Sequence, residues 1–152
     1  MLSHAARLEL IRSVFSAIPV YYMANILFSK KFIAKLTTVI RNFWWTGVRE
    51  TDSKKSLCLR AWKDICNSKT EGGLGIRNLK AINKSLILSA AWRLAKAPSS
   101  HLYLVLKAKY FHDASIWTAT AISPKSAFWA SILKLLPKLK AHSFYQLSQG
   151  NI

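Results

Sequence analysis

Apolar side chains recur at intervals of three and four residues along most of this 152-residue chain. Such spacing places them on one face of an α-helix, which turns once every 3.6 residues. The clearest example runs from Lys30 to about Trp45 and follows Ser29, a residue type that favours the N-cap position. Its apolar face is predicted to hold Phe32, Ile33, Leu36, Val39, Ile40, Phe43 and Trp44. We therefore predict an all-α fold, an irregular bundle of about five to seven helices.

Prolines and small polar residues set the expected helix ends in the first half of the chain. Ser3 can cap a first helix that Pro19 ends, and Pro19 can occupy the first turn of a second helix that reaches Phe28. Residues 46–56 are polar and contain a glycine, which is typical of a connecting loop. Residues 59–66 follow as a short apolar helix.

Similar signals set the helix ends farther along the chain. Pro98 ends a helix that Asn78 caps, and Ser99 or Ser100 caps another helix that runs through Phe111. The inward face of this second helix is predicted to hold Leu102, Val105, Leu106 and Tyr110.

The last part of the chain is predicted to contain one helix and a remnant of a hairpin. After a loop at residues 113–123, Ser123 and Pro124 are expected to open the helix, and Pro137 interrupts it. Residues 143–152 alternate apolar and polar and end in a turn signal. This pattern predicts one strand of a short β-hairpin whose partner is missing, as in a piece of a longer protein.

Three of the five glycines, Gly72, Gly73 and Gly75, fall within four positions. The run GLGIRN that contains two of them is close to a dinucleotide-binding fingerprint, with asparagine in place of the third glycine. No strand pattern precedes it, and no acidic residue follows at about twenty positions to hold a ribose. We therefore expect no cofactor and predict a tight connector, in which the glycines reverse the chain and Asn78 caps the next helix.

The charge of the chain points to a polyanionic partner. There are 23 Lys and Arg residues but 6 Asp and Glu residues, which gives a formal net charge of +17. Nucleic acid or an anionic membrane suits such a surface, although a solvated face that keeps the protein soluble is the alternative for any one helix. The candidate phosphate-binding residues are Lys31, Lys35, Arg41, Arg77, Lys80, Lys84, Lys107 and Lys109.

Neither a membrane span nor a metal site is expected. Residues 13–29 contain no charge, but 17 residues is the lower limit for a span, and Pro19 would break the helix at its middle. A mitochondrial transit peptide, suggested by Arg7 and Arg12, is not expected either. The two cysteines and four histidines are scattered without metal-ligand spacing, and the cysteine use fits a reducing, intracellular compartment.

Several motifs, in their order and spacing, resemble the C-terminal part of plant LINE-type (non-LTR) retrotransposon reverse transcriptases. They are IPVY at 18–21, RNFW at 41–44, EGGLGIR at 71–77 together with Asn83, and KAKYF at 107–111. The sequence departs from the family's pattern at Ala6, Ser29, Ser68 and Ala91.

The resemblance implies a region that follows the polymerase palm, namely the thumb and its connector. The implied organisation is thumb-like helices at 1–48, a polar loop at 49–58, a helical connector at 59–112, a loop at 113–123, and a C-terminal helix and tail at 124–152. In the family the catalytic aspartates lie upstream of this region and a zinc-binding segment lies downstream. The resemblance therefore implies no catalytic residue and no polymerase activity in this chain. The intact parent enzyme would be an RNA-directed DNA polymerase. If the chain shares the location of that family, the location is nuclear.

These observations predict a catalytically inactive fragment that binds nucleic acid through its backbone, irrespective of sequence. In the parent enzyme the partners would be a template and primer duplex and the missing palm domain. One alternative is a peripheral membrane or helix-partner protein that uses the same basic faces and the apolar segment 13–29. Another alternative is a gene relic with no selected activity.

Overall fold

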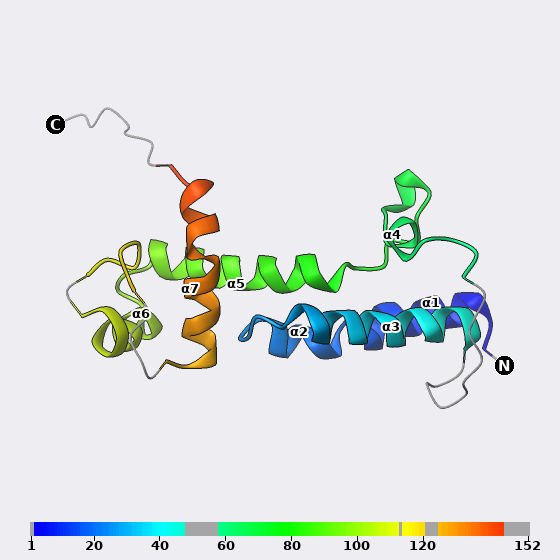
Figure 1. The fold of residues 1–152 in the computed structure, drawn as a ribbon, viewed down its shortest axis with the longest axis horizontal. Helices are drawn as coiled ribbons and strands as arrows, with labels where there is room; N and C mark the ends of the chain where they lie inside the picture. The colour runs from blue at the N-terminus through cyan, green and yellow to red at the C-terminus, as the bar shows by residue number, and fades with distance from the viewer. Residues whose placement is uncertain (1, 48–57, 113, 121–124, 145–152) are drawn as a thin grey trace. The chain divides into compact units, whose positions relative to one another are not determined.

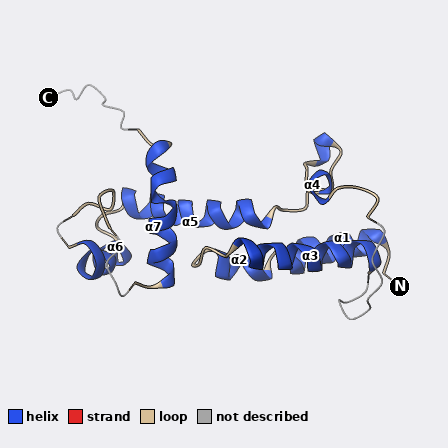
Figure 2. Cartoon of the chain, in the orientation of Figure 1, coloured by secondary structure: helices blue, strands red, loops and turns tan. Residues whose placement is uncertain are grey.

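All regular structure in the described part of the chain is helical, as Figure 2 shows. The computed structural model describes residues 2–47, 58–112, 114–120 and 125–144, and none of these residues forms a strand. The all-α prediction is therefore confirmed. Most of the predicted hairpin strand and of the polar loop after Gly47 lies outside the described residues.

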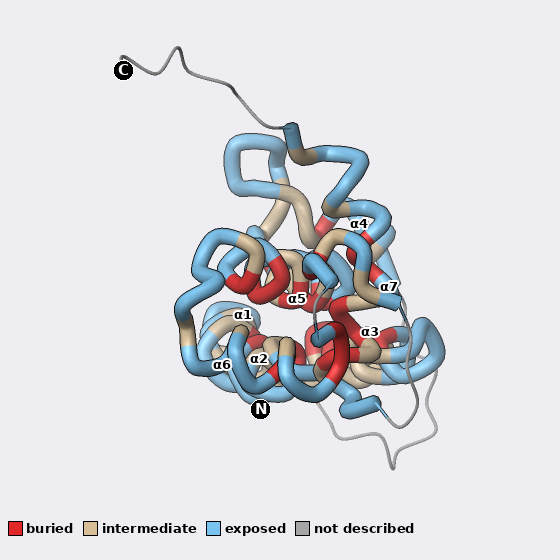
Figure 3. Tube along the Cα trace, turned by 90° about the vertical axis from the view of Figure 1, so that its left-hand side faces the viewer, coloured by how far each residue is buried: buried red, intermediate tan, exposed pale blue. Residues whose placement is uncertain are grey.

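Contacts between residues divide the chain into two compact units, Met1–Lys84 and Ser85–Ile152. The boundary falls within helix α5 (Leu79–Lys96). Figure 3 marks the buried positions in red. The buried apolar side chains of the first unit are Ile11, Met23, Ile33, Ile40, Trp44, Ile65, Ile76 and Leu79. Those of the second unit are Ile87, Ala90, Ala91, Leu94, Leu106, Tyr110, Phe111, Ile116, Trp129, Ile132, Leu135 and Leu136.

The first unit begins with three consecutive helical elements. Helix α1 (His4–Leu10) starts after Ser3, whose hydroxyl accepts a hydrogen bond of 3.2 Å from the Ala6 N–H. A π-helical turn, η1 (Ile11–Phe15), continues the chain and leads into α2 (Ile18–Met23). Pro19 lies in the first turn of α2, where its missing N–H costs no helical bond. These caps match the sequence prediction.

The predicted extension of the second helix to Phe28 is wrong, because α2 ends at Met23. Asn83, from a distant helix, holds the residues that follow. Its side-chain N–H groups donate to the carbonyls of Met23 and Ile26, and its side-chain oxygen accepts from the Phe28 N–H, each at 2.8 Å. These hydrogen bonds satisfy backbone groups that would otherwise have bonded within α2 if the helix had continued to Phe28.

Helix α3 (Lys30–Thr46) lies beside α1 in the first unit (Figure 1). Ser29 caps it as predicted, and it ends at Gly47 in the left-handed conformation, with φ at 68°. Arg7, only 6% exposed, donates hydrogen bonds to the carbonyls of Trp44 at 3.1 Å and Trp45 at 3.4 Å. A buried cation thus satisfies carbonyls at the helix C-terminus, where the helix dipole favours positive charge.

The predicted apolar face of α3 is confirmed at Ile33, Ile40 and Trp44, which are buried, but is wrong at Phe32. Phe32 is 46% exposed. Its ring meets Phe28 edge to face, with the centroids 4.9 Å apart, instead of entering the core.

The glycine-rich segment forms the predicted tight connector. After the short helices α4 (Trp62–Ile65) and η2 (Lys69–Glu71), Gly72 and Gly75 adopt positive φ values of 76° and 63°. Gly73 has a different role, because a Cβ there would lie 2.2 Å from the Asn67 carbonyl oxygen. Asn78 caps α5 as predicted, and its side-chain oxygen accepts from the N–H groups of Lys80 and Ala81.

Asparagine substitutions are expected to separate these two roles. Asparagine tolerates the left-handed conformation, and the space beside Gly72 is open, so Gly72→Asn should cost less than about 1 kcal/mol of unfolding free energy. Gly73→Asn should lower the free energy of unfolding by about 1–3 kcal/mol, because the added Cβ would push the Asn67 backbone away. Urea denaturation followed by circular dichroism checks this order. Equal costs at the two positions would contradict the close approach at Gly73.

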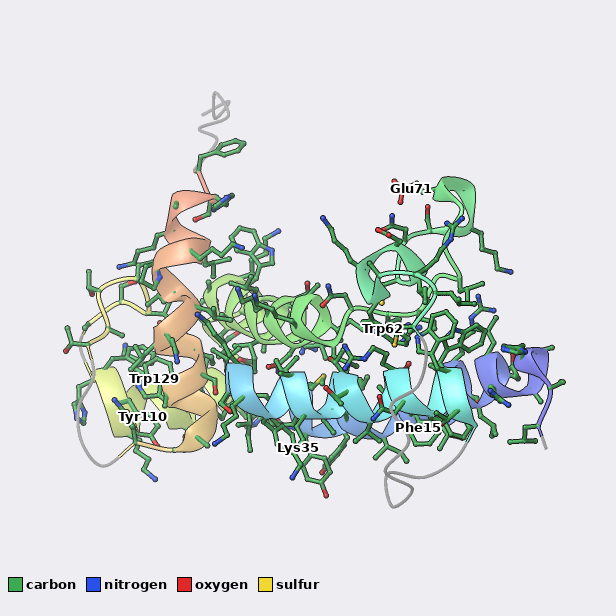
Figure 4. The ribbon with its side chains drawn as sticks, turned by 45° about the vertical axis from the view of Figure 1, so that its right-hand side comes forward. Phe15, Lys35, Trp62, Glu71, Tyr110 and Trp129 are labelled. Carbon is green, nitrogen blue, oxygen red and sulfur yellow. The ribbon has the colours of Figure 1, made fainter. Side chains whose placement is uncertain are left out.

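The second unit contains the later part of α5, then α6 (His101–Leu106), the π turn η3 (Lys107–Phe111) and α7 (Ala127–Ala141). Ser100 caps α6. The indole of Trp129 is 0% exposed and stacks on the rings of both Tyr110 and Phe111, with each pair of centroids 5.4 Å apart. Figure 4 shows Tyr110 and Trp129 side by side.

Two details predicted for α6 and α7 are wrong. Leu102 and Val105 are 51% and 62% exposed, which contradicts their predicted place on the inward face. The run LYLVL is apolar on every side, so its periodicity cannot select a face, and ring packing around Trp129 selects it instead. Pro137 does not interrupt α7, which continues to Ala141 with Leu135 and Leu136 buried before the proline. The helix is capped by Ser126, and the predicted Ser123 and Pro124 start lies outside the described residues.

Candidate nucleic-acid interface

Helix α3 carries three of the eight candidate phosphate-binding residues. Lys31 and Lys35 are exposed one turn apart, and Figure 4 shows Lys35 extending from the helix. Arg41 is half-buried, and its buried Nε has no hydrogen-bond partner among the described residues. Of the three candidates on α3, Lys31 and Lys35 are therefore the most open to a polyanion.

Three more candidates lie at the start of α5 in the same unit. Arg77 and Lys80 are exposed, and Lys84 is half-buried. Asn78 already occupies the N–H groups of Lys80 and Ala81, at 3.0 and 3.2 Å. An anion at this helix end would therefore meet side chains first, in the field of the helix dipole.

The last two candidates belong to the second unit, on the π turn η3. Lys107 is half-buried and Lys109 is exposed. The Lys109 ammonium lies 5.5 Å from the centroid of the Tyr110 ring, a favourable cation–π distance. The eight candidates thus form a set of six in one unit and a set of two in the other, and their role as one interface stays a prediction.

A small pocket in the first unit joins the candidate Arg77 to residues outside the predicted set of eight. The pocket has a volume of about 240 Å³ and is lined by Arg12, Ser16, Gly75 and Arg77. The Arg12 guanidinium donates a hydrogen bond to the Leu74 carbonyl, 62 residues away in the chain. None of the described acidic residues, Glu9, Asp64 and Glu71, lines the pocket. Periodicity gave no reason to choose Arg12 or Ser16, because only the folded connector brings them to Arg77.

The described residues hold neither a candidate metal site nor a candidate membrane span. They contain no group of three histidine, cysteine or acidic side chains that could hold a metal ion. None of their helices is both long and apolar enough to cross a membrane. Partial burial raises the pKa of the Cys66 thiol, which therefore stays protonated at neutral pH.

Two plant proteins are similar to this chain in sequence. An Arabidopsis thaliana protein named as a ribonuclease H protein is 37% identical over 144 residues, which cover 93% of this chain but 23% of that protein. An uncharacterized mitochondrial protein of Arabidopsis thaliana is 32% identical over 118 residues, which cover 77% of this chain and 75% of that protein. The chain belongs to the family of this mitochondrial protein.

The comparisons confirm the coarser part of the resemblance, a relation to plant retroelement-related proteins. No family model and no solved structure matches the chain. Because the chain spans about a quarter of the ribonuclease H protein, the activity named for that whole protein is not carried over here.

Proposed function

We propose that this chain binds nucleic acid through the phosphate backbone, irrespective of sequence, and has no polymerase activity of its own. It would act as the thumb and connector region of a LINE-type reverse transcriptase does, by gripping a duplex. The observation that carries the proposal is the charge of two helices. Helices α3 and α5 contain lysines and arginines but no acidic residue, and Lys31, Lys35 and Lys80 are exposed on them.

Phosphate contacts explain why such a surface would bind without reading sequence. A lysine at the backbone displaces condensed counterions from the nucleic acid, and this release favours binding to every base sequence equally. The affinity then falls steeply as the salt concentration rises. The plot of log K against the logarithm of the salt concentration falls with a slope of about 0.9 for each phosphate contact. The acidic residues in the described part of the chain, Glu9, Asp64 and Glu71, lie on three separate helices and not as a close carboxylate pair on a strand and turn, the arrangement that metal-dependent nucleotidyl transfer would need.

A salt titration of a charge variant tests the proposed surface. Replacing both Lys31 and Lys35 by glutamine should weaken duplex binding to the same extent for unrelated sequences and reduce the salt slope by about 2. The matched control replaces Lys138 and Lys140, two exposed lysines on α7 outside the proposed surface. Fluorescence anisotropy at several salt concentrations measures both variants. The proposal is wrong if the control loses as much affinity and slope as the test variant.

A second candidate function is attachment to an anionic membrane surface, favoured by the exposed side chains of α2. The exposed fractions of Ile18, Tyr21 and Tyr22 are 63%, 75% and 58%. The chain that carries them has a formal net charge of +17. Apolar and aromatic side chains of this kind can enter the interface of a bilayer while lysines contact the headgroups. Co-sedimentation with anionic and neutral vesicles, in the presence of competing DNA, separates this function from nucleic-acid binding.

A further inference from the structure

The pocket lined by Arg12, Ser16, Gly75 and Arg77 has the composition of an anion site. Two guanidinium groups come from segments far apart in the sequence, the π turn η1 and the connector before α5. The site is concave, and its described lining residues include two cations and no acid. Such a site attracts an anion more strongly than separate lysines on a convex helix surface do. We propose that this pocket binds a phosphate group.

Arg12 is already held in place for this role. One of its N–H groups is bonded to the Leu74 carbonyl, and among the described residues its side chain has no other hydrogen-bond partner. A guanidinium has five N–H donors in a planar fork, so donors remain for an oxygen in the pocket. Because the Leu74 bond orders the side chain beforehand, binding an anion would cost less conformational entropy there than at a free arginine.

Ser16 adds a hydroxyl group to the two arginines that line the pocket. Its side chain is only 2% exposed and lines the pocket, yet its hydroxyl has no hydrogen-bond partner among the described residues. The Ser16 hydroxyl can donate a hydrogen bond to an oxygen of a phosphate in the pocket. Arg77 likewise has no partner among the described residues and is exposed, so it is available to close over the anion.

Gly75 leaves room for this ligand. Its φ of 63° lies in the left-handed region, and a Cβ there would sit 3.7 Å from an Nη atom of Arg12. A longer side chain at this position would extend beside the guanidinium and fill the pocket. The glycine thus allows the positive φ of the turn, and it also leaves the Arg12 guanidinium accessible to a ligand.

The chemistry fits phosphate better than a carboxylate. A phosphate offers at least three outward oxygens, enough for Arg12, Arg77 and the Ser16 hydroxyl together, whereas a carboxylate offers two. The source of the phosphate could be the backbone of nucleic acid or a free phosphate ion. Only the assignment to the backbone rests on the proposed nucleic-acid binding.

Calorimetric titration of the full chain with inorganic phosphate, at constant ionic strength maintained with chloride, tests the pocket. Arg77→Gln should weaken phosphate binding about tenfold to a hundredfold, because it removes a charge-assisted hydrogen bond. Arg93→Gln, an exposed arginine on α5 outside the pocket, removes the same charge and should leave phosphate binding unchanged. Ser16→Ala leaves the net charge unchanged and should weaken binding about twofold to tenfold.

The same proteins are then titrated with a short duplex in the presence and absence of phosphate. If phosphate competes with the duplex in the wild type, the pocket takes a backbone phosphate. If phosphate binding depends on Arg77 but the duplex neither binds nor competes, the pocket takes free phosphate, and the proposed nucleic-acid binding fails separately. The pocket assignment is overturned if the wild type does not bind millimolar phosphate. It is also overturned if Arg77→Gln and Arg93→Gln lose phosphate affinity equally, even where duplex binding persists.

Discussion

Replacing Trp129 by alanine is expected to lower the free energy of unfolding by about 3–5 kcal/mol, the largest effect of any single change in the second unit. The indole is 0% exposed and lies against two other buried rings, Tyr110 and Phe111. Alanine would remove most of the packed surface and leave a cavity that a helical unit of this size can only partly close.

Two further tryptophan variants make this prediction specific. The Trp129 indole N–H is buried without a hydrogen-bond partner among the described residues, so Trp129→Phe removes an unsatisfied donor while it keeps a ring in the stack. We expect Trp129→Phe to cost less than half as much as Trp129→Ala. Trp92→Ala, at a side chain that is 37% exposed beside Lys96, should cost about 1 kcal/mol. Urea denaturation followed by circular dichroism provides the values, and similar costs for Trp92→Ala and Trp129→Ala would refute a core centred on Trp129.

Replacing Asn83 by alanine is expected to cost about 3–5 kcal/mol in the first unit. This 0% exposed amide satisfies three backbone groups, the carbonyls of Met23 and Ile26 and the N–H of Phe28. Each buried group that loses its partner costs about 1–3 kcal/mol, although water entering the space recovers part of this. Asn25→Ala, which removes an exposed bond to the Tyr21 carbonyl, is the matched control and should cost about 1 kcal/mol or less.

Asn83→Asp adds a pH dependence whose sign follows from the same contacts. A carboxylate at this buried position would face the carbonyl oxygens of Met23 and Ile26, so both burial and repulsion raise its folded pKa above the unfolded value of about 4. The folded state then holds the proton more tightly than the unfolded state, and stability falls as the pH rises above about 4. Urea denaturation at pH 4 and pH 7 measures the difference. A variant that is equally stable at both values would contradict the proposed contacts.

Much of the local structure could be predicted because local signals are strong in this chain. Ser3 and Ser29 cap helices as expected, Pro19 lies in a first turn, and Gly72 and Gly75 form a connector with positive φ. In each case the cause lies within a few residues of the effect, in a side-chain oxygen, a fixed φ or a missing Cβ.

The candidate site could be predicted only in part. The eight basic residues follow from composition and helix periodicity, and several of them are exposed as expected. The pocket could not be predicted, because Arg12 lies in a π turn and its partner Leu74 is 62 residues away. A sequence pattern with a period of 3.6 residues carries no information about such a contact.

The sequence by itself determined the helices, most of their caps, the tight glycine connector and the excess of positive charge. Each of these depends on interactions between residues that are close in the chain. The tertiary structure alone decided where α2 ends, which face of α6 is buried, and where Arg7 and Arg12 direct their charges. Those outcomes depend on buried polar groups finding partners and on rings filling space, and in a folded chain the partner can come from any distance along the sequence.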